Sequence, residues 1–163
     1  MAKQANVVID QEGHARLTEY GLAVINSDPR FAVAETPGAV GTSRWLAPEI
    51  INPSNNGDGI SAVESKPADV FAFAMFAVEV FTGKVPFEGH TSATAASWVL
   101  QGERPEMPGN AQDVGLTGEM WKLLESCWQQ DPEKRPTMDE VVRKWQKFVE
   151  RNDNTTTRCV QIP

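Results

Sequence analysis

The stretch from Ser65 to Thr82 stands out because apolar residues fall on nearly every face that a helix would present. Ser65 precedes Lys66-Pro67, a pattern typical of a helix start, and Gly83 follows as a typical helix end. A helix that is hydrophobic all round is normally buried in the middle of a domain. The sequence therefore predicts a central buried helix over residues 65–82.

Apolar stripes at three- and four-residue spacing predict further helices beyond this one. They cover Thr91–Gln101, Gly118–Gln129 and Met138–Glu150, and a short helix is expected to start at Pro48. Thr137 and Glu140 are spaced as a capping box at the start of the last helix. The tryptophans on these stripes are expected to be core residues: Trp98, Trp121, Trp128 and Trp145.

The amino-terminal part of the chain has a different pattern. Two short β-rich runs, at residues 6–10 and 15–18, flank the turn-forming residues 11–14 and predict a hairpin. Residues 22–46 have weak periodicity and predict a long loop, and residues 53–59 form a polar surface insertion. The expected fold is mainly α, one domain over residues 1–150, with a small β-hairpin at its amino end. Residues 151–163 form a polar tail, and its Thr155-Thr156-Thr157 end is expected to be frayed.

Composition narrows the function classes. The chain has 15 basic and 22 acidic residues, a net charge of −7, and a pI near 4.8. Such a balance argues against nucleic acid or an anionic membrane as a partner. No signal-peptide pattern and no long apolar run occur, so an intracellular, cytoplasmic protein is expected.

The two cysteines differ in their surroundings. Cys127 lies in an apolar pattern, which predicts a buried thiol, whereas Cys159 lies in the polar tail and is expected to be a free thiol.

The most informative stretch is Gly41-Thr42-Ser43-Arg44-Trp45-Leu46-Ala47-Pro48-Glu49. It resembles the end of a protein-kinase activation segment, where the chain enters the helical lobe. Further matches follow in the family's order: Lys3 and Asn6 (end of the catalytic loop), Glu19-Tyr20-Gly21 (the Asp-Phe-Gly position), Asp69, and Cys127-Trp128 through Arg135-Pro136. The chain looks like the carboxy-terminal, helical lobe of a protein kinase, most similar to the tyrosine-kinase-like group of serine/threonine kinases.

The resemblance assigns roles at the catalytic centre. It implies that Asn6 and Glu19 hold Mg²⁺, although Glu19 is one methylene longer than the family's aspartate and would misplace the ion. Lys3 would contact the transferred phosphate, and Thr42 would position the catalytic loop and substrate. The position of the family's catalytic aspartate is taken by Met1.

The resemblance also assigns structural and regulatory roles. It implies that Asp69 braces the catalytic loop and that Glu49 pairs with Arg135, tying the activation segment to the helical core. The candidate phosphorylation sites are Thr36, Thr42 and Ser43. A phosphate on one of them could order the segment if a basic residue such as Arg44 lies near it.

Two functions remain open at this stage. The chain could be part of a serine/threonine kinase whose amino-terminal lobe is missing from this sequence; Mg²⁺ and ATP are then implied cofactors, with a protein as substrate. The alternative is a complete, catalytically dead pseudokinase that binds proteins. No Gly-x-Gly-x-x-Gly occurs, and the ATP-binding lysine of the missing lobe is absent. In either case the chain alone is expected to be inactive. Its oligomeric state is not indicated.

Overall fold

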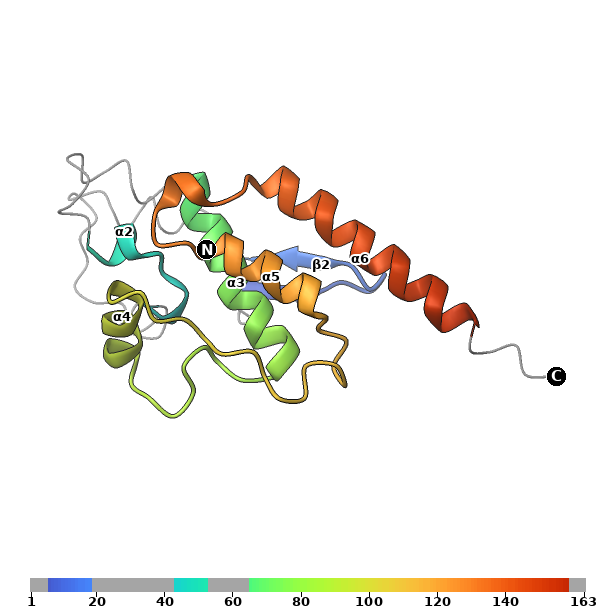
Figure 1. Ribbon diagram of the computed structural model, residues 1–163, viewed down its shortest axis with the longest axis horizontal. Helices are drawn as coiled ribbons and strands as arrows, with labels where there is room; N and C mark the ends of the chain where they lie inside the picture. Colours follow the sequence, from blue (N-terminus) through green and yellow to red (C-terminus); the bar gives the residue numbers. More distant parts are fainter. Residues whose placement is uncertain (1–5, 19–42, 53–64, 159–163) are drawn as a thin grey trace.

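The computed structural model describes residues 6–18, 43–52 and 65–158, and Figure 1 shows their arrangement. Helices dominate, accompanied by one two-stranded antiparallel sheet, so the predicted mainly α fold with an amino-terminal hairpin is confirmed. The elements are β1 Val7–Ile9, β2 Ala15–Leu17, η3 Ser43–Trp45, α2 Pro48–Ile51, α3 Lys66–Thr82, α4 Ser92–Leu100, α5 Gly118–Cys127, η5 Pro132–Lys134 and α6 Met138–Arg158.

Helix α3 lies in the middle of the helical body, with α5 and η3 packed against it (Figure 1). Its ends follow the predicted signals. The Ser65 hydroxyl accepts a hydrogen bond from the Ala68 N–H, and Gly83 adopts a left-handed conformation with φ of 66°. Phe71 and Met75 are fully buried. The central position of the predicted helix is thus confirmed.

One stripe of α3 departs from the prediction of burial on every face. Asp69 is exposed, Phe73 and Phe76 are half-buried, and Val80 is 55% exposed. These residues follow one another at three- or four-residue spacing, so they lie on one side of the helix. Apolar composition alone cannot reveal which side of a helix is less completely covered.

The tryptophans divide between core and surface. Trp121 and Trp128 are buried and meet edge to face, with ring centroids 5.3 Å apart. Trp145 of α6 is half-buried against Phe73, at 5.6 Å. Trp98 of α4 is also only half-buried, and it lines a surface hollow instead of the core. The prediction that all of these residues are core is therefore wrong for Trp98.

Helix α6 begins as predicted and ends later. Thr137 and Glu140 form the capping box: the Thr137 N–H donates to the Glu140 carboxylate at 2.8 Å, and the Thr137 hydroxyl accepts from the Glu140 N–H at 3.4 Å. The Glu140 carboxylate accepts hydrogen bonds from both the N–H and the hydroxyl of Thr137, and these bonds lower the pKa of Glu140. The helix continues to Arg158, so the predicted helix end at Glu150 and the expected frayed end at residues 155–157 are both wrong. No glycine or proline interrupts residues 138–158.

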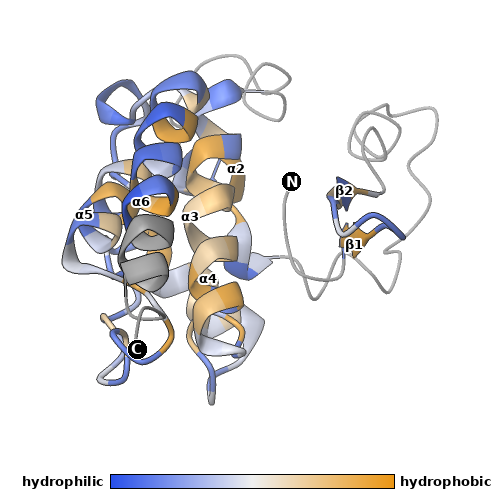
Figure 2. Ribbon diagram, turned by 90° about the vertical axis from the view of Figure 1, so that its right-hand side faces the viewer, coloured by the Kyte–Doolittle hydropathy of each residue, from blue (hydrophilic) through white to orange (hydrophobic). Residues whose placement is uncertain are grey.

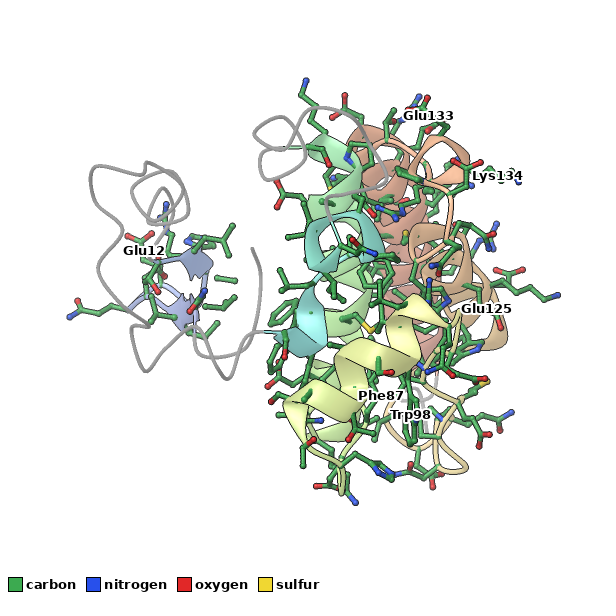
Figure 3. The ribbon with its side chains drawn as sticks, turned by 90° about the vertical axis from the view of Figure 1, so that its left-hand side faces the viewer. Glu12, Phe87, Trp98, Glu125, Glu133 and Lys134 are labelled. Carbon is green, nitrogen blue, oxygen red and sulfur yellow. The ribbon has the colours of Figure 1, made fainter. Side chains whose placement is uncertain are left out.

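The hairpin stands apart from the helices in Figures 2 and 3. Val7 pairs with Leu17 and Ile9 with Ala15. The turn is fixed by the Asp10 carboxylate, which accepts from the N–H groups of the residues two and four positions later. Ile9 and Leu17 remain 66% and 58% exposed, so the hairpin buries little apolar surface. Within the described ranges, no helix has the length and apolar character needed to cross a membrane.

A buried ion pair joins α2 to the segment that precedes α6. Both terminal nitrogens of Arg135 donate to the Glu49 carboxylate, at 2.6 and 2.9 Å, and the two side chains are 0% and 6% exposed. Arg135 also donates to the main-chain oxygens of Pro67 and Gln129, and its guanidinium lies 5.1 Å from the centre of the Phe71 ring. The arginine thus holds α2, the start of α3 and residues 129–135 together.

Removing either partner leaves a buried charge without its counterion. We expect Glu49→Ala and Arg135→Ala each to lower the free energy of unfolding by roughly 3–5 kcal/mol. The double variant should lose much less than the sum, because it strands no charge. Urea denaturation of the single and double variants measures this. The exposed pair Glu119–Arg151, 3.0 Å apart, is the matched control, with single effects of about 0–1 kcal/mol. Additive losses at Glu49 and Arg135 would contradict the coupling.

Cys127 offers an independent test of the core. The thiol is completely enclosed in the hydrophobic cluster, and burial raises its pKa to about 12. Near pH 8 the reactive thiolate is therefore scarce as well as inaccessible. A Cys159→Ser variant should react with iodoacetamide very slowly when native and rapidly in urea, as measured by intact mass. Rapid alkylation of the native variant would show that this core opens readily.

Candidate functional site

The residues proposed from the sequence divide into two groups. Met1, Lys3, Glu19, Thr36 and Thr42 lie outside the described residues, so their predicted roles stay predictions. The structure does place Asn6, Ser43, Glu49, Asp69 and Arg135. Of these, it brings Glu49 and Arg135 into direct contact.

Asn6 lies immediately before β1, where the hairpin closes. The residue is buried, at 9% exposure, and its side-chain oxygen is enclosed. The Thr18 N–H donates to the Asn6 main-chain oxygen at 2.7 Å, which continues the pairing of Val7 with Leu17 by one step. The hairpin therefore places Thr18, the residue directly before Glu19 in the chain, opposite Asn6.

Asp69 lies in the first turn of α3, where the helix dipole favours a carboxylate. It lines a groove of about 920 Å³, together with Leu17 of β2, Phe73 and residues 132–133 and 135–139. The groove runs beside the carboxy-terminal end of the hairpin. Asp69 therefore faces the same region as the hairpin, on a different element.

Residues 43–45 are held to the helical body through their side chains. The Ser43 hydroxyl donates to the main-chain oxygen of Ser92, the first residue of α4, at 3.2 Å. The Trp45 indole N–H donates to the Glu79 carboxylate of α3, at 3.1 Å, and both residues are buried. Phosphorylation of Ser43 would remove its donated hydrogen bond. Its candidacy as a phosphosite stays a prediction.

The Arg44 side chain is hydrogen-bonded to the main chain of the loop between α3 and α4. One terminal nitrogen donates to the main-chain oxygens of Pro86 and Phe87, at 2.8 and 2.9 Å, and the other donates to that of His90. Phe87 has φ of 57°, the left-handed region that a bulky residue rarely occupies. Bonded in this way, the guanidinium is a structural clamp. Its suggested role as the partner of a phosphate in this segment stays a prediction.

Sequence reasoning missed these contacts and one more. Arg104 donates to the main-chain oxygens of Val99 and Trp128 and to the side chain of Gln130. Burial lowers its pKa to about 10.

The sequence did contain a signal that Glu79 needs a buried partner, because it is the one acidic residue in the apolar run 70–82. A carboxylate placed there needs a buried donor, and the Trp45 indole supplies one.

The hairpin turn carries a group of possible metal ligands. Ligand atoms of Asp10, Glu12 and His14 lie within 4.8 Å of one another. The Asp10 carboxylate is already engaged by Arg16 at 2.8 Å and by the turn's N–H groups. Arg16 and the turn's hydrogen bonds lower the pKa of Asp10 and explain the position of the carboxylate without an ion.

The Arg44 clamp can be tested by changing its donor geometry. A lysine cannot reproduce the fork of donors that reaches separate carbonyls, so Arg44→Lys should loosen the loop nearly as much as Arg44→Ala. Hydrogen exchange read by mass spectrometry should quicken across residues 84–90 while α5 and α6 keep their protection. Arg143→Ala, an exposed arginine bonded within its own helix, is the control. Unchanged exchange across residues 84–90 would refute the clamp.

Comparison with known proteins agrees with this geometry. The family model described as protein tyrosine and serine/threonine kinase matches residues 2–145. The chain is 33% identical over 152 residues to serine/threonine-protein kinase STY17 of Arabidopsis thaliana, covering 90% of this chain and 23% of that protein.

Two other relatives extend the match. The chain is 32% identical to the putative serine/threonine-protein kinase/receptor R831 of Acanthamoeba polyphaga mimivirus, over 93% of this chain and 8% of that protein. It is 28% identical to serine/threonine/tyrosine-protein kinase HT1 of Arabidopsis thaliana, over 91% of this chain and 34% of that protein. The chain thus spans about a third or less of each of these relatives. The match over residues 2–145 shows that this chain belongs to the protein tyrosine and serine/threonine kinase family.

Proposed function

We propose that the chain is the helical-lobe part of a protein kinase domain that transfers phosphate from ATP to serine or threonine hydroxyls of proteins. Residues 1–150 form this part in the proposal. The observation that carries it is the anchoring of residues 43–49, which Arg44, Trp45 and Glu49 fix to the α3–α4 loop, to α3 and to Arg135.

Phosphoryl transfer gives this anchoring a purpose. The protein contributes mainly positioning and charge stabilisation, and an error of about 1 Å can cost on the order of 10²-fold in rate. A segment that presents a substrate hydroxyl must therefore be held rigidly. Anchors on separate elements of the core provide that rigidity for residues 43–49.

The implied cofactors are Mg²⁺ and ATP. Asn6 fits a magnesium ligand in chemical type, because its buried side-chain oxygen is a hard donor. In the proposal, Asn6 and Glu19 would hold the ion, Lys3 would contact the transferred phosphate, and Thr42 and Asp69 would position the catalytic loop. Bound magnesium would neutralise charge on the phosphates.

We propose further that these 163 residues alone do not bind ATP productively. They contain no Gly-x-Gly-x-x-Gly, and methionine stands at the position of the catalytic aspartate. The partners proposed are protein substrates, in the cytoplasm. The net charge of −7 argues against nucleic acid and anionic membranes.

A catalytically dead, protein-binding module is the alternative, and Glu19 is the observation that favours it. The longer side chain moves a metal ligand away from the position that an aspartate would give it. Such a protein would keep the anchored segment and the helical surface, and would lack transfer activity.

The test uses the protein expressed from its own gene with a carboxy-terminal tag. The purified protein should run well above 17.9 kDa and transfer labelled phosphate from ATP to casein on serine or threonine. Asn6→Ala should lower the transfer rate roughly 10²-fold through loss of metal positioning. Asn110→Ala, at an exposed asparagine remote in sequence, should leave the rate unchanged.

The other results each decide against the proposal. A larger protein with no transfer activity, whose Asn6→Ala variant behaves as the parent, would favour the dead module. A protein of 17.9 kDa that transfers phosphate would show that the missing ATP-binding motifs are not required.

A further inference from the structure

A surface hollow of about 670 Å³ lies where α3 ends, away from the hairpin and the ion pair. Its walls come from the end of α3, the loop that Arg44 holds, Trp98 of α4 and the chain that follows α4. The residues that line it are Val78, Thr82, Lys84, Val85, Pro86, Phe87, Glu88, His90, Trp98, Gln101 and residues 103–106.

One wall of the hollow is aromatic. Phe87 and Trp98 lie close together in Figure 3 and meet edge to face, with ring centroids 5.8 Å apart. The centroid of the His90 ring lies 4.4 Å from that of Trp98. Trp98 is only half-buried, although an indole is among the most favourable groups to bury. The main chain of Phe87 adopts a left-handed φ, which is strained for a bulky side chain. Backbone strain of this kind persists where surrounding contacts enforce it, and it is concentrated at binding sites.

The charges around the hollow are unbalanced. Lys84 is paired with Glu88 at 2.7 Å. Arg104 also lines the hollow, and its donors are bonded to main-chain oxygens and to Gln130. Glu103 and Glu106 are exposed, and within the described part of the chain neither carboxylate has a cation within ion-pair distance. The local cations are therefore already committed, while these carboxylates can accept another.

We propose that this hollow binds an arginine side chain presented by a protein partner. A guanidinium stacks on an indole face and can take hydrogen bonds from a carboxylate at its edge, whereas its apolar stem suits walls such as Val78 and Val85. An acidic partner would be repelled by Glu103 and Glu106. An apolar partner that covered those carboxylates would remove them from water without supplying a counterion.

The site does not depend on phosphate transfer, since none of its walls belongs to the residues assigned to magnesium or ATP. It does share one support with residues 43–49. Arg44 fixes both the segment before α2 and the carbonyls of Phe87 and His90. An occupant of the hollow would therefore contact the loop to which that segment is clamped.

A blocked tetra-arginine peptide serves as the probe, with tetra-lysine and tetra-glutamate peptides as comparisons. Indole N–H signals of the ¹⁵N-labelled chain report binding, and Trp98→Phe identifies the Trp98 signal. We expect tetra-arginine to shift that signal, to bind more tightly than tetra-lysine, and to bind roughly tenfold more weakly to Glu103→Gln/Glu106→Gln, a loss of about 1.4 kcal/mol. Tetra-glutamate should shift nothing.

The control variant, Glu133→Gln/Glu150→Gln, removes the same charge elsewhere. Both residues are exposed, and Figure 3 shows Glu133 at the opposite end of the helical body from Trp98. Equal weakening in both double variants would mean attraction to net charge only and would overturn the site. So would an unmoved Trp98 signal, or a Trp98 shift that depends on protein concentration without peptide, which would indicate a second copy of the chain. Unchanged signals of the other tryptophans show that each variant is folded.

Discussion

The buried contact between Glu49 and Arg135 is the constraint on which the arrangement of the helices depends. Two ions removed from water are stable only when each is fully satisfied, and here both guanidinium ends and both carboxylate oxygens are used. The Arg135 Nε–H donates to the main-chain oxygen of Gln129, and the guanidinium lies over the Phe71 ring. The pair therefore holds α2 against the core.

The segment that enters α2 is fixed by contacts of different physical kinds. Trp45 combines apolar burial with one hydrogen bond to Glu79, while Arg44 binds main-chain oxygens in a neighbouring loop. Since these contacts reach separate elements, displacement of the segment would disturb α3 and the α3–α4 loop together. The functional segment and the proposed arginine site are thus parts of one connected structure.

Much of the fold could be predicted because its signals are local. Ser65 and Gly83 mark the ends of α3, and Thr137 with Glu140 marks the start of α6. The family's motifs identified the kinase resemblance in the same way. The partners of Arg44 could not be predicted, because they are main-chain oxygens more than 40 residues away and carry no side-chain signature. The exposure of Trp98 was missed for a related reason: periodicity identifies a stripe and not what covers it.

The ion pair also sets an order in which the chain can acquire its structure. Glu49 and Arg135 are separated by 86 positions, and α2 is only 4 residues long, too short to persist by itself in water. During synthesis on the ribosome, Glu49 of α2 can pair with Arg135 only after the 86 residues that follow it have emerged. Contacts between such distant positions form late, because closing the intervening loop costs entropy. The segment that carries the family's most recognisable motif is therefore among the last to settle.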